Sequence, residues 1–167
     1  MKKITALAAS LLIGVAVQQT ANGQTKQSNS SKTNKTTTME NQSAQQQIEK
    51  SLTIYFDALN KSSVEQAVGQ YTADGVFMPT GLPTASGTAE LNIAYTNVFK
   101  AIQLNVKFDI EEITVADDIA FVRTQSHGTQ LIHATGQKTE ELNREFFLLK
   151  RENGAWKIAR YMFNQPK

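Results

Sequence analysis

The stretch NVKFDIEEITV, residues 105–115, decides the fold, because the spacing of apolar residues changes there from that of a helix to that of a strand. Apolar and polar residues alternate up to Ile110, and the alternation resumes at Ile113 on the opposite parity. Successive side chains of a strand point to opposite faces, so this change of parity predicts a β-bulge at residues 111–112. The stretch is therefore the first long strand of a predicted sheet.

Three further strands are predicted downstream, separated by turn signals such as Asn153-Gly154. Gly128 lies inside the first of them and predicts a second bulge or a bend. Consecutive strands joined by hairpins form an antiparallel meander. The three strands cover residues 119–133, 138–151 and 155–164.

Helical spacing precedes the sheet. Capping-box patterns that begin at Ser43 and Ser62 predict the starts of two helices, and Gly87-Thr88 opens a third. A short strand, Val76-Phe77-Met78, lies between the second and third helices and ends at Pro79. Apolar residues at helical spacing occupy residues 48–59, 64–71 and 91–102.

Three helices packed on one face of a bent antiparallel sheet make an α+β domain. A sheet that bends around helices encloses a cone, and a cone with apolar walls suits a small molecule. The sequence therefore predicts an internal pocket.

The first 44 residues are predicted to lie outside this domain. Residues 1–23 combine a basic start, an apolar run and small residues before Gln24, which is typical of a cleaved signal peptide. Residues 24–44 are mostly polar and predict a disordered linker. The domain is expected over residues 45–167 of an exported protein, periplasmic or secreted.

Charge narrows the class of partner. Cleavage after Gly23 would remove Lys2 and Lys3, leaving 15 basic residues against 15 acidic ones, and residues 48–167 carry 12 basic against 14 acidic residues. A slightly acidic domain without a basic stripe argues against a nucleic acid partner, and against a membrane partner once the signal is cleaved.

Four motifs in this order resemble the SnoaL-like branch of the nuclear transport factor 2-like superfamily, and specifically its ketosteroid isomerase-related members. They are YFDALN at 55–60, YTADGV at 71–76, SGTA at 86–89 and GAWKIA at 154–159. The resemblance covers about residues 45–165. It implies a cone-shaped fold with three N-terminal helices on a curved antiparallel sheet. It does not fix an activity, because this superfold hosts isomerases, dehydratases, hydrolases, cyclases and non-catalytic adaptors.

The resemblance also implies candidate catalytic residues. Tyr55 falls where ketosteroid isomerase carries the first-helix tyrosine of its oxyanion hole, and Glu145 falls near its carboxylic-acid donor. The equivalent of the general base is missing, because Met78-Pro79-Thr80 holds no carboxylate. A general base supplies about 10²- to 10⁴-fold of rate, so this departure argues against ketosteroid isomerisation. Tyr55 also fits a purely structural role on the apolar face of its helix.

Arg123 and His127 share strand parity with Phe121, so these two polar side chains are expected beside apolar ones. If that face is concave, both line the pocket, and His127 could move protons near neutral pH. If the sheet bends at Gly128, the same end of the strand is simply hydrated.

The strand around Arg144 and Glu145 is apolar on both faces, which predicts cover on both sides. One cover is the helices, and the other is a second copy of the chain, so a homodimer is expected. One of these two charged residues should face inward and be paired.

No metal and no cofactor are predicted. The chain has no cysteine, and its two histidines, His127 and His133, would lie about 20 Å apart on an extended strand. The predicted pocket lining is Tyr55, Phe77, Tyr95, Phe99, Phe121, Arg123, Arg144 and Asn164.

Three functions remain open. The first is binding of a small apolar molecule without catalysis. The second is an acid–base enzyme of isomerase, dehydratase or hydrolase type on an apolar, ring-containing substrate, with Tyr55, His127 and Glu145 as catalytic candidates and Arg123 beside them. The third is a non-catalytic dimerisation scaffold whose cone is filled by its own side chains.

Overall fold

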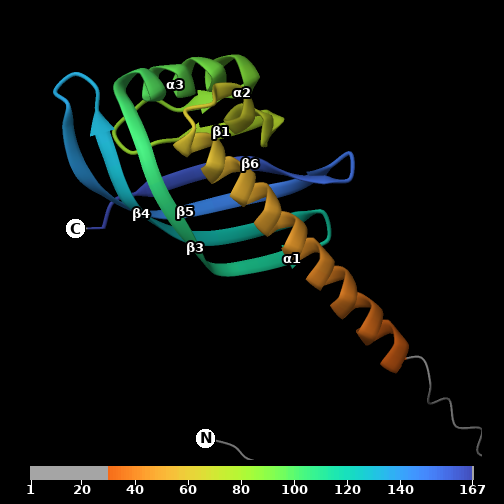
Figure 1. Ribbon diagram of the computed structural model, residues 1–167. Helices are drawn as coiled ribbons and strands as arrows, with labels where there is room; N and C mark the ends of the chain where they lie inside the picture. Colours follow the sequence, from red (N-terminus) through yellow and green to blue (C-terminus); the bar gives the residue numbers. More distant parts are fainter. Residues whose placement is uncertain (1–29, 167) are drawn as a thin grey trace, which may run out of the picture.

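The computed structural model describes residues 30–166. Three helices lie on one side of a curved six-stranded sheet (Figure 1). The helices are α1 Ser30–Asn60, α2 Val64–Gly69 and α3 Gly87–Ala101, and the strands are β1 Tyr71–Met78, β2 Ala85–Ser86, β3 Ile102–Ala116, β4 Ile119–Ile132, β5 Gln137–Glu152 and β6 Ala155–Asn164. The predicted α+β class is confirmed.

The sheet is mixed, which corrects the expectation of a purely antiparallel one. Its strand order is β2-β1-β6-β5-β4-β3, and β1 runs parallel to β6. The four long strands form the predicted meander. The sequence contains turn signals that predict pairing between consecutive strands. It contains no such signal for the pairing of β1 with β6, which begins about 80 residues later.

The predicted bulge lies in β3, where the register with β4 shifts between Ile110 and Glu112. Gly128 is not a bulge, because the register of β4 with β3 and β5 continues through it, but its φ of +152° is one that residues with a side chain rarely adopt. A Cβ at Gly128 would overlap the carbonyl oxygen of Asn105 and lie 2.9 Å from the Cα of Val106. The close approach of β4 to β3 therefore requires glycine here.

The helices cover the concave face of the sheet. Phe56 of α1 stacks on Phe108 of β3 with ring centroids 4.2 Å apart. At the end of α1, the side chain of Asn60 donates to the carbonyl of Val106 and accepts from its N–H, both at 2.8 Å. These contacts fix α1 against the bent end of β3. The short helix α2 is capped by Ser63, whose hydroxyl accepts from the N–H of Gln66.

Helix α1 begins at Ser30, earlier than the predicted start at Ser43, so part of the expected linker is helical. Met39 to Ser43 are exposed, and contact with the core begins at Ala44 and Ile48. Extending a helix from an anchored segment adds a hydrogen bond for each residue that is fixed, so a polar overhang can form. It projects away from the sheet in Figure 1. The predicted signal peptide, residues 1–23, and residues 24–29 lie outside the described residues.

Deleting residues 24–42 is expected to leave the unfolding temperature unchanged, because the exposed residues before Ala44 bury almost nothing. The measurement is thermal unfolding of the two forms side by side by circular dichroism. A drop of several degrees in the shortened form would show that this part of α1 docks on the domain.

Between residues 30 and 166, no helix has both the length and the apolar character needed to cross a bilayer.

Candidate functional site

A cavity of about 250 Å³ lies between the concave face of the sheet and the helices. Its helical side is mostly apolar apart from the hydroxyls of Tyr55 and Tyr95, and its sheet side carries polar groups from β4 and β5. The lining includes Tyr55, Phe56, Leu59, Phe77, Pro79, Leu82, Tyr95, Val98, Ile102, Leu104, Val106, Ser126, Gln130, Glu141, Asn143, Glu145, Tyr161 and Phe163. We refer to it as the inner cavity.

Strand β5 supplies most of the polar wall. Glu141, Asn143 and Glu145 alternate with exposed residues and are all buried, so all three point toward the helices. The next inward residues, Phe147 and Leu149, are fully buried and apolar. One row of side chains along β5 therefore passes from polar, at the cavity, to apolar, in the core.

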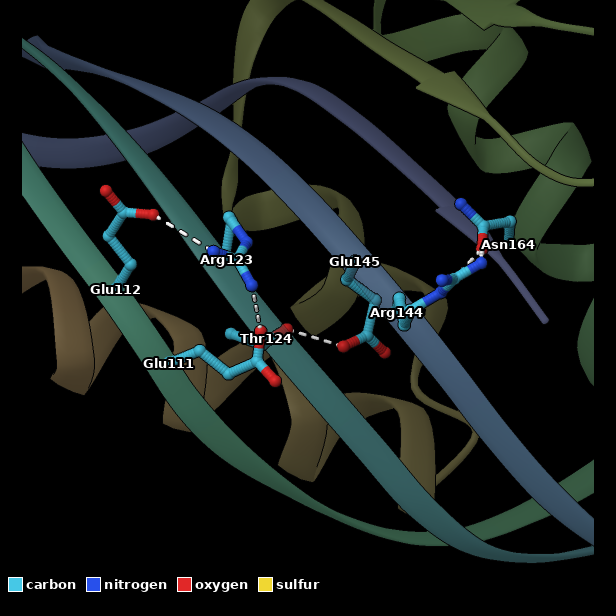
Figure 2. Close-up of polar contacts among 7 residues, drawn as sticks. All are labelled: Glu111, Glu112, Arg123, Thr124, Arg144, Glu145 and Asn164. Carbon is cyan, nitrogen blue, oxygen red and sulfur yellow. Dashed lines mark hydrogen bonds and ion pairs between the residues drawn. The ribbon is translucent and has the colours of Figure 1, made fainter. Parts of the chain in front are cut away.

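Glu145 is held by two hydroxyl groups and no cation. Its side chain is 4% exposed. The Thr124 hydroxyl donates to one carboxylate oxygen at 2.5 Å, and the Ser126 hydroxyl donates to the other. Figure 2 shows Thr124 and Glu145 pointing toward one another from neighbouring strands. Burial raises the pKa of Glu145 above its usual value, the two hydroxyl donors lower it, and the charge of Glu141 raises it further.

The raised pKa of Glu145 has a consequence for stability. The folded chain holds this proton to a higher pH than the unfolded chain, so ionising Glu145 destabilises the fold as the pH rises through the folded-state pKa. Glu145→Gln is therefore expected to unfold at a higher temperature than the wild type at pH 8. The two should converge below pH 4.5, the ordinary pKa, where the carboxyl is protonated in both states.

Thermal unfolding between pH 4 and pH 8 measures this difference. Glu140→Gln is the matched control, because Glu140 is the exposed neighbour on the same strand and should show no such trend. A difference between wild type and Glu145→Gln that stays constant over the whole pH range would contradict the prediction.

Glu141 and Asn143 form a second polar unit. Glu141 is 8% exposed, and one of its carboxylate oxygens accepts from the Asn143 side-chain amide at 2.9 Å. Only the NH₂ group of an amide can donate, so this bond turns the Asn143 carbonyl oxygen the other way. Among the described residues, neither that oxygen nor the second Glu141 oxygen, Oε2, has a hydrogen-bond partner. Two acceptors on residues that line the cavity thus have no partner, and both oxygens are covered by neighbouring atoms.

Three buried tyrosines share one row of hydroxyl groups. The Tyr95 hydroxyl lies 2.6 Å from that of Tyr55 and 2.7 Å from that of Tyr71. Burial raises the pKa of all three, so the hydroxyls stay protonated at physiological pH. Tyr95 has one proton to share between two neighbours, so one end of the row keeps a proton to donate. Tyr55 and Tyr95 line the inner cavity.

A larger hollow of about 630 Å³, here called the outer groove, lies between α3 and the segment that joins β1 to α3. Leu82 and Ile93 line it and are largely exposed. Five residues line both the outer groove and the inner cavity: Phe77, Pro79, Leu82, Val98 and Ile102. The two spaces therefore adjoin along a common apolar wall.

Comparison with known proteins places this architecture in a family. The family model described as SnoaL-like domain matches residues 52–161, about two thirds of the chain. The chain belongs to the SnoaL-like domain family. A ketosteroid isomerase-like protein from Erwinia carotovora atroseptica is 35% identical, with 71% of this chain and 95% of that chain covered and a TM-score of 0.68.

Two further solved structures share the fold. A conserved protein from Planctomyces limnophilus is 20% identical, with 74% of this chain and 98% of that chain covered and a TM-score of 0.66. A nuclear transport factor 2-like protein with a cystatin-like fold, from Novosphingobium aromaticivorans, is 16% identical, with 78% and 87% covered and a TM-score of 0.64. A search of curated proteins returns no match.

The SnoaL-like domain brings together several of the residues singled out in the sequence. Tyr55, Phe77, Tyr95 and Glu145 all line the inner cavity. Phe99 is buried in the core beside Tyr95 and is not among the lining residues. Of the charged pair on β5, Glu145 is the one that faces inward, and its partners are hydroxyls.

Arg123 and His127 lie on the convex face, which corrects their predicted place in the pocket. Arg123 pairs with Glu111 at 2.6 Å and with Glu112 at 3.4 Å, and Figure 2 shows it between the two carboxylates. The β3 bulge allows both consecutive glutamates to reach the same arginine. His127 lies 3.6 Å from Asp109, half exposed.

Phe121, Arg144 and Asn164 lie on the convex face as well, so these pocket assignments are also corrected. The Arg144 guanidinium donates twice to the Asn164 side-chain oxygen, at 2.6 and 3.0 Å (Figure 2). Phe121 stacks on Phe146, with ring centroids 6.0 Å apart. The alternation along β4 correctly placed Phe121, Arg123 and His127 on one face of the sheet. It could not show which face the helices cover, because long-range packing decides that.

Residues 78–80, where ketosteroid isomerase would carry its general base, lie at the inner cavity but contribute no carboxylate. Pro79 and Thr80 line the inner cavity, and the Thr80 hydroxyl donates to the Phe163 carbonyl at 2.5 Å. The carboxylates of the cavity come instead from β5. No group of three or more metal-ligating side chains occurs among residues 30–166.

Among the polar residues that the sequence did not predict, Ser126, Glu141 and Asn143 line this SnoaL-like cavity, and Thr124 donates to Glu145. Their signal was parity, since two share the face of Glu145 on β5 and two share the face of Val122 on β4. A polar residue that lies an even number of positions from a buried apolar residue on the same strand faces the same side, and this rule would have identified all four.

Proposed function

We propose that this SnoaL-like domain binds a small organic molecule in the inner cavity, with the apolar part of the molecule against the helices and its polar group against β5. The observation that carries the proposal is the inner cavity itself, which apolar side chains line together with the buried polar side chains Glu141, Asn143 and Glu145 of β5. A buried polar group without a partner costs about 1–3 kcal/mol, and a donor on a ligand would offset that cost once the Glu141 or Asn143 side chain turns toward the cavity. The ketosteroid isomerase-like name of the Erwinia relative is in keeping with a ring-containing ligand.

Native mass spectrometry of the protein purified from its own host tests this proposal. We expect a mass increment that disappears on denaturation, because a buried ligand is released with the fold. A chain of unchanged mass that also binds nothing in a fragment screen by nuclear magnetic resonance would favour the alternative of a non-catalytic scaffold.

A second candidate is acid–base chemistry of the isomerase or lyase type. The observation that favours it is Glu145, a buried carboxyl with a raised pKa that lines the same cavity as the protonated Tyr55 and Tyr95. Groups of this kind donate hydrogen bonds to a developing oxyanion. A β,γ-unsaturated ketosteroid is expected to show no enzyme-like turnover, because residues 78–80 offer no base. Absorbance of the conjugated enone measures this, and turnover abolished by Glu145→Gln would establish catalysis.

We further propose that two copies of the chain associate through the convex face of the sheet. Phe146 is 41% exposed, stacks on Phe121 and lies opposite the exposed Met162 on β6. Stable interfaces bury about 1,200–2,000 Å² in total, so the dimer should persist at micromolar concentration. Light scattering is expected to give twice the chain mass for the wild type and the single-chain mass for Phe146→Asp. Ile93→Asp, an exposed apolar residue on α3, is the control and should stay dimeric.

We also propose that the protein is exported, because residues 1–23 carry a basic start, an apolar run and then small residues, as a signal peptide does. N-terminal sequencing of the periplasmic or secreted protein should then begin at Gln24. A mature cytoplasmic protein that still begins at Met1 would contradict it.

A further inference from the structure

The inner cavity and the outer groove together define the chemistry of a ligand. The polar side of the inner cavity is acidic, because Glu141 and Glu145 both line it and neither forms an ion pair among the described residues. Among the described residues that line either space, none is lysine, arginine or histidine. A ligand group that satisfies two acceptors, one of them on a carboxylate, must bring several donors, and a positive charge adds to the attraction.

On the other side of the shared wall, the outer groove is largely apolar. The outer groove runs from the shared wall of Phe77 and Val98 to the exposed side chains of Leu82 and Ile93. An aliphatic chain fits such a surface because each methylene removed from water contributes about 0.8 kcal/mol. An inner cavity of about 250 Å³ exceeds the 150 Å³ or so that accommodates benzene, so it has room for a compact head group and the first few carbons.

We infer that the ligand is an amphipathic amine, whose ammonium group is held by Glu141 and Asn143 and whose apolar chain crosses the shared wall into the outer groove. This inference rests on the proposed function and names the ligand class for it. Each ammonium proton can meet one acceptor, and Glu141 supplies the opposite charge in a buried setting. The chain leaves the inner cavity between Val98 and Leu82 and lies against Ile93.

The test is calorimetric titration of the wild-type protein with three ligands of one chain length: octylamine, octanol and octanoate. Octylamine is expected to bind at least tenfold more tightly than octanol, because only the amine carries a charge and three donors. Octanoate should bind more weakly than either, since its carboxylate faces Glu141. Propylamine is expected to bind at least tenfold more weakly than octylamine, given about fourfold for each buried methylene.

Two variants separate the head group from the chain. Glu141→Gln keeps the size of the side chain and should reduce the preference for octylamine over octanol to less than threefold. Ile93→Asp, at a site 63% exposed and therefore tolerant of charge, should leave propylamine binding unchanged and remove most of the gain from the longer chain. Asn92→Asp, on the same helix but outside both linings, is the control.

The outcomes distinguish failure of the amine inference from failure of the proposed small-molecule site. Equal affinity for the amine and the alcohol, or tightest binding of octanoate, would overturn the amine inference while leaving a small-molecule site in place. Octylamine bound equally well by wild type and Ile93→Asp would overturn the route of the chain. Failure of all four compounds, together with no ligand in native mass spectra, would remove the proposed function as well.

Discussion

Replacing Gly128 by alanine is expected to lower the free energy of unfolding by about 4 kcal/mol or more, the largest loss we predict for a single methyl group in this chain. The added carbon would overlap the Asn105 carbonyl oxygen and lie 2.9 Å from the Val106 Cα, so backbone and not a flexible side chain must move. The φ of +152° adds strain of its own. Asn60 clamps the same part of β3, which limits its retreat.

Urea unfolding of wild type and variant measures this loss. Gly69→Ala is the matched control, because Gly69 ends α2 with nothing within 4 Å of the added carbon. That change should be neutral or slightly stabilising, since alanine restricts the unfolded chain. A Gly128→Ala loss below 1 kcal/mol would mean that β3 and β4 separate easily at the bend.

Tyr95→Phe is expected to cost about 2–4 kcal/mol although it removes only one oxygen atom. That oxygen is shared by Tyr55 and Tyr71, and its loss takes away two hydrogen bonds inside the core. Both remaining hydroxyls would then stand in an apolar environment without the partner they share. The ring itself is retained, so its stacking on Phe77 should survive.

Comparing the stability loss of Tyr95→Phe with that of Tyr55→Phe tests whether Tyr95 is the shared partner of the other two hydroxyls. Removing the Tyr55 hydroxyl breaks one bond and leaves Tyr95 bonded to Tyr71, so the expected loss is about 1 kcal/mol. Denaturant unfolding of both variants measures the ratio. Equal losses would show that the three hydroxyls do not act as one row with Tyr95 at its centre.

Much of the fold could be predicted from the sequence because its signals act over a few residues. The parity change at residues 111–112 located the β3 bulge, Gly87 located the start of α3, and the turns located the meander. Gly128 was singled out as a special backbone position, and its positive φ agrees with that, although it forms no bulge. In each case the physical cause lies within the element itself.

The site was predicted less well because its composition depends on distant packing. Parity showed that Arg123 and His127 share a face, but the helices that determine the concave side are remote in sequence. The resemblance to ketosteroid isomerase supplied Tyr55 and Glu145, which do line the cavity, although no carboxylate replaced the missing base. Glu141 was overlooked because a glutamate near a turn is usually solvated.

The parallel pairing of β1 with β6 bears on when the chain can fold. Ile158 of β6 donates its N–H to Gln70, just before β1, and Arg160 donates to the Asp74 carbonyl. Strand β6 thus lies between β1 and β5, and the sheet stays split until β6 has been synthesised. Contacts this distant in sequence close slowly. Of the six strands, β6 comes last along the chain, so the two parts of the sheet can join only after all the other strands have been made.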